Sequence, residues 1–213
     1  MSKILPLFIP FAGCRFNCIY CDQEKISGAS AGDILLRTSE TVREQLNLAD
    51  WDEIAFFGGS FTCLEKELRL KLYDMVSETN LPLRFSTSPD CIDDEVLDEA
   101  KSYNVETIEL GIQSLDEAVL KANKRPYTAQ TALEALKAVR RAGFKSGVQI
   151  MAGMHRQSEA SFAETVKSLC EEGADYARVY PAVVIEGTEL EQLYNTGEFV
   201  PWEPAAIIRM CGF

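Results

Sequence analysis

Three cysteines, Cys14, Cys18 and Cys21, lie within eight positions near the N-terminus. Thiolates this close in sequence can meet at one centre only from a loop, and three soft sulfur ligands suit zinc, copper(I) or an iron–sulfur cluster. A closed zinc site needs four ligands, and the next cysteine, Cys63, stands alone in the sequence. Three thiolates on an iron–sulfur cluster would leave one iron open to a further ligand. The spacing therefore favours such a cluster, with a zinc-binding loop as the alternative.

The apolar run before this loop, residues 4–11, is also the place for a lipoprotein signal that ends at Cys14. The run is barely eight residues long, is broken by Pro6 and Pro10, and is preceded by a single basic residue, Lys3. It is too short and too weakly basic for a targeting segment, so we expect it to be part of the fold.

The whole chain has the composition of one folded domain. Its 213 residues are 46% hydrophobic and 25% charged, and the chain is slightly short for an eight-stranded barrel of about 250 residues. No run of about 18 apolar residues occurs, so we expect no membrane span. Seven irregularly spaced cysteines predict a reducing, cytoplasmic setting rather than a disulfide framework. The net charge of −12 argues against general attraction to nucleic acid or anionic lipid, although a local basic groove remains compatible with it.

Six short apolar stretches alternate with helical patterns along the chain. Strands that alternate with helices imply parallel strands joined by right-handed crossovers. We therefore predict an α/β fold, a partial (β/α)6 TIM-like barrel of parallel strands, as a single domain over residues 1–213. The expected strands are residues 4–11, 53–57, 83–87, 107–112, 146–152 and 177–184.

Residue patterns also mark the ends of several helices. Thr62 and Glu65 have the spacing of a capping box for the helix after the second strand. The two helices on either side of the fifth strand are expected to stop at Gly143 and Gly173. A short last helix is expected to start near Glu203, and this abrupt ending is consistent with truncation of a longer parent chain.

Unusual residues follow each predicted strand. In parallel α/β folds, binding residues collect at the carboxyl ends of the strands, and glycines there let backbone groups approach a ligand closely. Each polar residue alone is equally well explained as a strand-end or capping residue, but their shared position predicts one binding edge. The residues are the cysteine loop, Gly58-Gly59-Ser60, residues 86–90, Gln113 with Ser114, Gln149, and residues 180–182.

The cysteine spacing, with the aromatic Tyr20 just before the third cysteine, resembles the signature of the radical SAM enzymes. Residues 108–128 include Glu-Leu-Gly-Ile-Gln-Ser-Leu-Asp and Lys-Arg-Pro-Tyr-Thr, and they look like the Elp3 and oxygen-independent coproporphyrinogen oxidase (HemN-like) type. Residues 178–190, Arg-Val-Tyr-Pro-Ala-Val-Val-Ile-Glu-Gly-Thr-Glu-Leu, are similar to the elongator-type subgroup in particular. The resemblance covers the chain from about residue 6 to residue 202.

The resemblance implies a radical SAM enzyme with two cofactors. In that family three thiolates hold a [4Fe–4S] cluster, and the amino and carboxylate groups of S-adenosylmethionine bind its fourth iron. Cys14, Cys18 and Cys21 would therefore ligate a cluster. An electron from a donor such as flavodoxin or ferredoxin would cleave S-adenosylmethionine to a 5′-deoxyadenosyl radical, which removes a hydrogen atom from the substrate. No catalytic side chain beyond the cluster ligands is needed for that cleavage.

The resemblance also implies which residues contact S-adenosylmethionine. Arg125 would pair with its carboxylate, because a planar guanidinium is suited to that group. Ser86 stands where related enzymes often have an acidic ribose contact, so its hydroxyl would be a weaker partner. The other implied contacts are Tyr20 beside the adenine, Gly58, Gly59 and Ser60 at the amino acid end, Gln113 and Gln149 at the ribose and methionyl parts, and Ala182 at the adenine through its backbone.

Three motifs depart from the elongator-type pattern. The pattern Thr-Arg-Pro-Asp is Thr-Ser-Pro-Asp at residues 87–90, Arg-Gly-His-Thr is Arg-Pro-Tyr-Thr at residues 125–128, and Gly-Leu-Pro-Gly is Gly-Met-His-Arg at residues 153–156. The cofactor positions are largely kept and the residues on the expected substrate side are not, so the substrate of the relatives does not transfer. His155 lies in one of these loops, either as a proton donor or as a solvated loop residue.

The sequence therefore predicts a radical SAM enzyme of unknown substrate, with RNA modification, as in elongator-type relatives, as one option. The net negative charge and the lack of a recognisable acetyltransferase domain argue against a complete enzyme that modifies the wobble uridine of tRNA. One alternative is an electron carrier, which would not need Gly58, Gly59, Gln113 or Arg125. The other is a non-catalytic or truncated iron–sulfur or partner-binding remnant of this fold.

Overall fold

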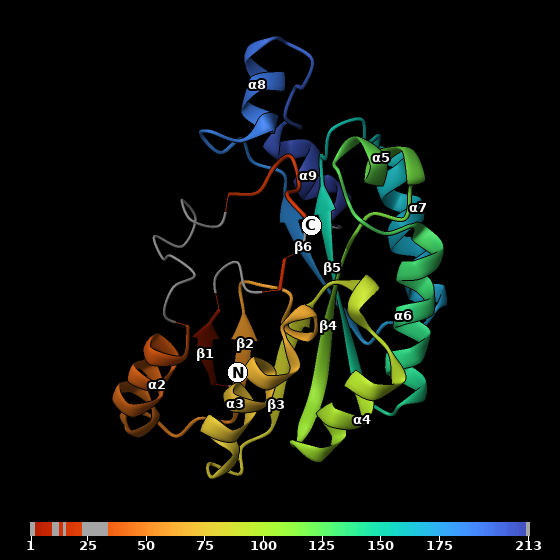
Figure 1. Ribbon diagram of the computed structural model, residues 1–213. Helices are drawn as coiled ribbons and strands as arrows, with labels where there is room; N and C mark the ends of the chain where they lie inside the picture. Colours follow the sequence, from red (N-terminus) through yellow and green to blue (C-terminus); the bar gives the residue numbers. More distant parts are fainter. Residues whose placement is uncertain (1–2, 10–12, 15, 23–33, 212–213) are drawn as a thin grey trace.

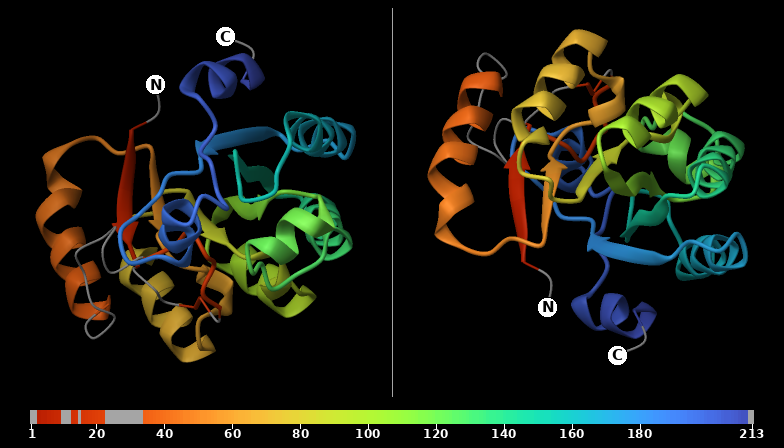
Figure 2. Two further views of the ribbon diagram at one scale, coloured as in Figure 1. Left: turned by 90° about the horizontal axis from the view of Figure 1, so that it is seen from above. Right: turned by 90° about the horizontal axis from the view of Figure 1, so that it is seen from below.

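The computed structural model describes residues 3–9, 13–14, 16–22 and 34–211. Six parallel strands form one sheet in the order of the sequence, and the sheet curls into a half-barrel with α2 to α7 on its outer side (Figures 1 and 2). The predicted partial (β/α)6 barrel is therefore confirmed. The strands are β1 Ile4–Phe8, β2 Glu53–Phe57, β3 Leu83–Thr87, β4 Val105–Gln113, β5 Lys145–Ala152 and β6 Tyr176–Pro181.

Eight helices and three 3-10 turns are assigned in the described parts of the chain. Helix α8 lies beyond the carboxyl ends of the strands, at the top of Figure 1. None of these helices is both long enough and apolar enough to cross a membrane. The helices are α2 Ile34–Gln45, α3 Lys66–Ser77, α4 Asp94–Ser102, α5 Glu117–Ala122, α6 Ala129–Arg141, α7 Glu159–Glu171, α8 Glu189–Asn195 and α9 Pro204–Met210, and the turns are η2 Leu46–Leu48, η3 Phe61–Cys63 and η4 Pro89–Cys91.

The predicted strands differ from the observed ones mainly at their ends. β2 and β3 match, β4 and β5 begin slightly earlier than expected, and β6 ends at Pro181 rather than at residue 184. β1 ends at Phe8, and residues 10–11 of the expected first strand lie outside the described residues. The expected stops at Gly143 and Gly173 are confirmed, because α6 and α7 end just before these residues.

The capping box predicted from Thr62 and Glu65 is wrong. Thr62 lies in η3, and its hydroxyl is 2.6 Å from the Thr87 hydroxyl at the end of β3. Helix α3 begins one residue after Glu65, and the Glu65 side chain makes no capping hydrogen bond. The turn after β2 thus uses its threonine to join two neighbouring strand ends, so the hydroxyl does not cap the helix.

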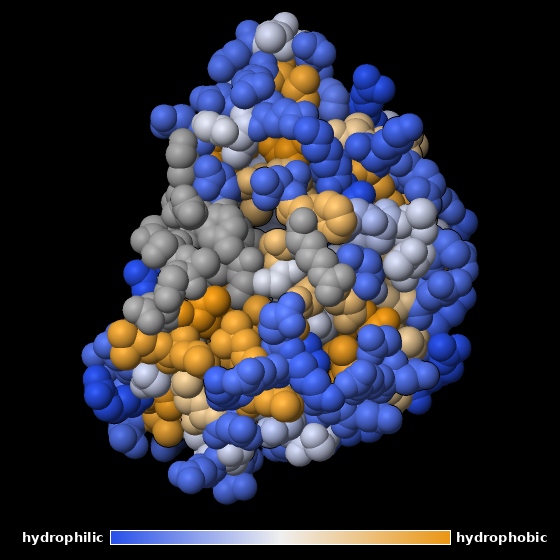
Figure 3. All heavy atoms as spheres, viewed as in Figure 1, coloured by the Kyte–Doolittle hydropathy of each residue, from blue (hydrophilic) through white to orange (hydrophobic). Residues whose placement is uncertain are grey.

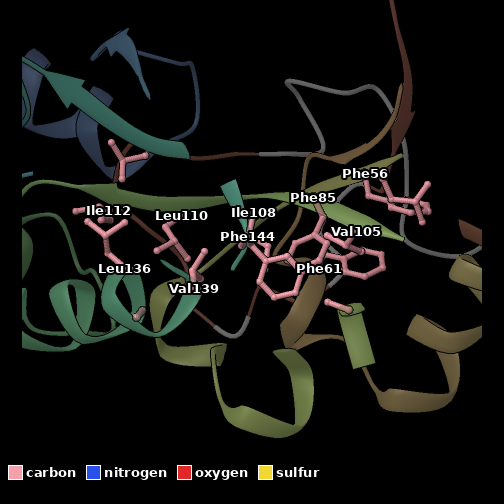
Figure 4. Close-up of a cluster of buried hydrophobic side chains, with 14 of the residues drawn as sticks. Phe56, Phe61, Phe85, Val105, Ile108, Leu110, Ile112, Leu136, Val139 and Phe144 are labelled. Carbon is pink, nitrogen blue, oxygen red and sulfur yellow. The ribbon is translucent and has the colours of Figure 1, made fainter. Parts of the chain in front are cut away.

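Alternating side chains on β4 serve the two faces of the sheet. Ile108, Leu110 and Ile112 point toward α6, where they pack near Leu136 and Val139 (Figure 4). Glu109, between Ile108 and Leu110, points into the concave interior, where its carboxylate accepts hydrogen bonds from Arg84 of β3 and Gln149 of β5. The outer side of the helices on the right of Figure 3 is largely hydrophilic. The apolar core therefore lies between the sheet and the helices, and the interior of the half-barrel is left for polar chemistry.

Aromatic residues fill the core behind β2 and β3. Phe61 stacks between Phe56 and Phe85, with ring centroids 4.8 and 4.9 Å apart, and Tyr73 of α3 packs edge-on against Phe61 at 4.9 Å. All four side chains are fully buried. Because Phe61 opens the turn after β2, this stack fixes that turn against the sheet.

A disulfide joins Cys63 in η3 to Cys91 in η4 across a sequence separation of 28. Treating Cys63 as isolated was therefore wrong. The two turns follow the neighbouring strands β2 and β3, so they lie side by side, with the two Cα atoms 5.3 Å apart. The bond ties together two of the loops at the carboxyl edge of the sheet.

Replacing both bonded cysteines, as Cys63→Ser with Cys91→Ser, is expected to lower the free energy of unfolding by about 3–4 kcal/mol, because a closed loop of this length restricts the unfolded chain. Denaturant unfolding under non-reducing conditions measures the change. Cys170→Ser, at an exposed cysteine of α7, is the control and should leave stability unchanged. Equal stability of the double variant and the wild type would show that the bond does not constrain the chain.

Candidate functional site

A cavity of about 410 Å³ lies at the carboxyl edge of the sheet, where the cysteine loop meets the strand ends. It is lined by all the residues predicted to bind a cofactor or metal except Ala182. Those lining residues are Cys14, Cys18, Tyr20, Cys21, Gly58, Gly59, Ser60, Ser86, Gln113, Arg125 and Gln149. Ala182 lines a separate apolar groove beside β6 and α9. The structure thus brings residues from all six strands and from the cysteine loop to one space.

The cysteine loop is anchored to the rest of the fold through Ile19, which is 2% exposed. Its backbone N–H donates to the Asn123 carbonyl at 3.4 Å, and its carbonyl accepts from the Leu190 N–H at 2.8 Å. The Ile19 side chain packs with Leu190 and Phe199 in a small apolar cluster. The segment that contains Cys18, Tyr20 and Cys21 is therefore held between α5 and α8.

The three thiols share the cavity, and their chemistry suits an iron–sulfur cluster. Cys14 Sγ lies 3.7 Å from Ser60 Oγ, which places the first cysteine against the turn after β2. Among the described residues, no three His, Cys, Asp or Glu side chains are grouped closely enough to hold a metal ion. Three thiol groups are the right type of ligand for an iron–sulfur cluster, but in this structure they are not grouped closely enough to bind one metal ion together.

The turn after β2 brings bare backbone to the cavity. Gly58 has a φ of +102°, and a Cβ built on it would lie 2.8 Å from the Phe8 ring. A side chain at this position would strain the backbone, and the Phe8 ring would have to move to make room for it. The glycine therefore keeps the Gly58-Gly59-Ser60 backbone open to a ligand.

Gln113 presents an unused hydrogen-bond acceptor to the cavity. The residue has a φ of +63° at the end of β4, where the register with β5 shifts. It is 8% exposed, and its Oε1 has no hydrogen-bond partner among the described residues. A buried acceptor left without a partner is costly, so a ligand that donates an N–H or O–H here would be stabilised.

Arg125 supplies a positive charge beside the thiols. Its Nη1 lies 3.1 Å from Cys18 Sγ, and its Nη2 donates to the Gly111 carbonyl at 2.8 Å. Within the described parts of the chain, no carboxylate pairs with this guanidinium. A partly buried arginine without an anion is suited to bind the carboxylate of a ligand.

Tyr127 contacts Arg125 directly, which corrects its expected place on the substrate side. Its hydroxyl accepts hydrogen bonds from Arg125 Nη2 at 2.6 Å and from Nε at 2.9 Å, and the side chain is 6% exposed. Burial raises the pKa of Tyr127 to about 12, although the charge of Arg125 lowers it, so the phenol stays protonated near neutral pH. Sequence reasoning missed this residue, because the only signal was its position two residues after Arg125.

Ser86, Gln149 and Glu109 form the floor of the cavity and the interior below it. Gln149 Nε2 donates to Ser86 Oγ at 2.9 Å and to Glu109 Oε2 at 3.0 Å. Because a carboxylate only accepts, this contact fixes which end of the Gln149 amide is the NH2 group. Sequence reasoning did not select Glu109, whose side chain is fully buried.

The Glu109 carboxylate pairs with two arginines of the half-barrel. Its Oε1 is 3.0 Å from Arg84 Nη1 and 3.0 Å from Arg178 Nη2, and it accepts from the Tyr176 hydroxyl at 2.8 Å. Arg84 also pairs with Glu53 of β2. Burial and the adjacent Glu109 carboxylate raise the pKa of Tyr176, so it remains a donor. The network links side chains from β2 to β6.

His155 does not line the cavity that holds the thiols. It lies after β5 in a second cavity of about 340 Å³, with its ring 6.1 Å from the Phe199 ring. Burial and the nearby Arg156 lower the pKa of His155, and Glu198 raises it. The structure therefore does not bring this histidine together with the predicted cofactor residues.

Comparison with known proteins identifies the family that these features belong to. The family model described as the radical SAM superfamily matches residues 8–169. An uncharacterized protein of Methanocaldococcus jannaschii, MJ0486, is 29% identical over 153 residues, which cover 68% of this chain and 47% of that protein. A tRNA uridine(34) acetyltransferase of Methanocaldococcus infernus is 25% identical over 146 residues, which cover 67% of this chain and 27% of that protein. The chain therefore spans less than half the length of these two relatives.

A solved structure with the same fold is that of archaeal Elp3 from Methanocaldococcus infernus, which lacks its N-terminal residues 1–46. It superposes with a TM-score of 0.76 at 20% sequence identity and covers 99% of this chain and 53% of the Elp3 chain. At this identity the likeness shows the shared fold alone.

Glu109→Gln is expected to destabilise the fold by about 3 kcal/mol, because it removes a fully buried negative charge and leaves Arg84 with Glu53 alone. The cost at Arg178 is smaller, since that side chain is 37% exposed. Thermal or denaturant unfolding measures the loss. Glu106→Gln, at an exposed position of the same strand, should change stability little. A Glu109→Gln protein as stable as the wild type would show that the two arginines do not depend on this carboxylate.

Proposed function

The chain belongs to the radical SAM superfamily, and we propose that it holds a [4Fe–4S] cluster on Cys14, Cys18 and Cys21 and cleaves S-adenosylmethionine reductively. The observation that carries the proposal is the shared cavity, which is lined by the three cysteines and by Arg125. The guanidinium lies 3.1 Å from Cys18 Sγ, and no described carboxylate neutralises it. When bound, the cluster supplies one electron to S-adenosylmethionine, which yields the 5′-deoxyadenosyl radical for hydrogen abstraction.

The amino acid end of S-adenosylmethionine would lie between the cysteine loop and the turn after β2. The open backbone at Gly58 and Gly59 receives the methionyl amino group, and Ser60 lines the same side. Arg125 binds the carboxylate, since it is the cation next to Cys18. These groups orient the cofactor, and none of them needs to exchange a proton during cleavage.

The nucleoside end would lie over the ends of β3, β4 and β5. Gln113 offers its unpartnered Oε1 to a ribose or methionyl donor. Gln149 has its amide nitrogen committed to Ser86 and Glu109, so its Oε1 is the atom that can accept from a ribose hydroxyl. Tyr20, at the rim of the cavity, and the backbone of Ala182, beyond it, are assigned to the adenine.

The substrate class we propose is an RNA nucleoside, as in the relative whose name specifies tRNA uridine. The net charge of −12 gives the chain no general attraction to RNA, so binding of the RNA would depend on further protein surface. The electron would come from a small carrier such as flavodoxin or ferredoxin. A reducing, cytoplasmic setting suits the three thiolate ligands, although the Cys63–Cys91 disulfide does not favour that setting. Residues 1–213 would act as one radical SAM core domain.

Anaerobic reconstitution with iron and sulfide, followed by reductant and S-adenosylmethionine, is expected to yield 5′-deoxyadenosine. Iron and sulfide content and quantification of the nucleoside by chromatography are the measurements. Cys18→Ala should abolish the product, because it removes one of the three cluster ligands. Cys170→Ala, at an exposed cysteine outside the cavity, should leave it unchanged.

The negative outcomes distinguish the rival explanations. A stable cluster without 5′-deoxyadenosine would support a non-catalytic iron–sulfur or partner-binding protein with this fold. A protein that takes up no iron at all would overturn the assignment of the cysteine loop.

A further inference from the structure

We propose that Tyr127 is a positioning residue, which aims the Arg125 guanidinium at the carboxylate of S-adenosylmethionine; this inference rests on the function proposed above. Tyr127 touches neither the thiols nor the open part of the cavity in any contact found among the described residues. It would therefore act only through Arg125.

The hydrogen bonds of Arg125 divide the guanidinium into a held edge and a presented end. Nε and Nη2 both donate to the Tyr127 hydroxyl, at 2.9 and 2.6 Å, and Nη2 also donates to the Gly111 carbonyl at 2.8 Å. Nη1 instead faces the cysteine loop, 3.1 Å from Cys18 Sγ and 3.3 Å from the Tyr20 hydroxyl. A ligand chelated beside the cysteine loop would meet the Nη1 end first.

The hydrogen bonds among the described residues use every donor and acceptor position of the Tyr127 hydroxyl. A phenol donates one hydrogen bond and accepts two. Here it accepts the two from Arg125 and has two carbonyls at the end of β4 as targets for its own proton, those of Gly111 and Ile112. The sheet thus fixes the phenol, and the phenol fixes the guanidinium.

Without the Tyr127 hydroxyl, the Arg125 guanidinium could turn toward a nearby carboxylate, that of Asp90. Arg125 and Asp90 line the same small cavity of about 40 Å³ beside the main one. A released arginine would be drawn toward the Asp90 carboxylate and away from the ligand, because unlike charges attract strongly where water is partly excluded. Tyr127 therefore keeps the positive charge available to the cofactor.

Tyr127 is one of the positions at which this sequence departs from the elongator-type pattern. The elongator-type pattern has histidine where this sequence has Tyr127. A neutral histidine has one acceptor nitrogen and one donor nitrogen on opposite sides of its ring, so it cannot accept two hydrogen bonds from one guanidinium at a single atom. The fork between Arg125 and Tyr127 is thus a local solution for holding the arginine.

The test compares binding of S-adenosylmethionine with binding of its decarboxylated analogue, which lacks only the carboxylate. Isothermal titration of the anaerobically reconstituted, unreduced protein avoids turnover. Tyr127→Phe keeps the ring and removes the hydroxyl, and it is expected to weaken S-adenosylmethionine binding about tenfold, as expected for lost hydrogen bonds to a charged group. Its affinity for the decarboxylated analogue should equal that of the wild type.

Matched variants separate positioning from folding. Tyr103→Phe removes a tyrosine hydroxyl that bonds to Asp74 away from the cavity, and it should bind both ligands like the wild type. Arg125→Lys should reduce the preference for the carboxylate, leaving the part that is due to the open iron, and adding Tyr127→Phe to it should cost nothing further. Tyr127→His, which restores one acceptor, should fall between Tyr127→Phe and the wild type.

The outcomes distinguish a failure of this inference from a failure of the proposed function. If the wild type binds both ligands equally well, Arg125 does not bind the carboxylate, and the proposed binding mode is overturned. If the wild type discriminates and Tyr127→Phe discriminates equally, or loses affinity for both ligands alike, Tyr127 has no positioning role. Discrimination that is about tenfold smaller in Tyr127→Phe than in the wild type, with the analogue bound as before, supports the inference.

Discussion

The fold depends on one buried carboxylate in the interior of the half-barrel. Glu109 is fully buried, and Arg84, Arg178, Tyr176 and Gln149 all meet it from neighbouring strands. A parallel sheet that curls on itself needs side chains to fill its concave interior. Here that space holds charged side chains, which neutralise one another as ion pairs. Because Gln149 is part of the same network, the charge balance of the interior also sets the floor of the cavity.

The wall of the cavity follows the same principle of fixing a polar group through its neighbours. Arg125 is held by Tyr127 and by the backbone at the end of β4, and the cysteine loop is held by Ile19 between α5 and α8. Arg125 and the cysteine loop are therefore each held by a buried partner. Such support is what lets a cofactor site keep its geometry without the cofactor's own contacts.

The sequence was informative where local chemistry decides structure. Apolar runs bounded by Gly58 and by Pro89 located β2 and β3, and the cysteine spacing with Tyr20 located the loop that shares a cavity with the strand ends. It failed where partners are distant in sequence. Nothing local marks Glu109 as a shared counter-ion, pairs Cys63 with Cys91, or turns Thr62 from a helix cap into a partner of Thr87, because each depends on which strands become neighbours.

The central claim, that S-adenosylmethionine binds beside a cluster held by the cysteine loop, is tested most directly by electron paramagnetic resonance. The anaerobically reduced protein should give the signal of a reduced [4Fe–4S] cluster, and addition of S-adenosylmethionine should change that signal, because the ligand would bind next to the open iron. A cluster signal that S-adenosylmethionine leaves unchanged, or the absence of any cluster signal, would contradict this account.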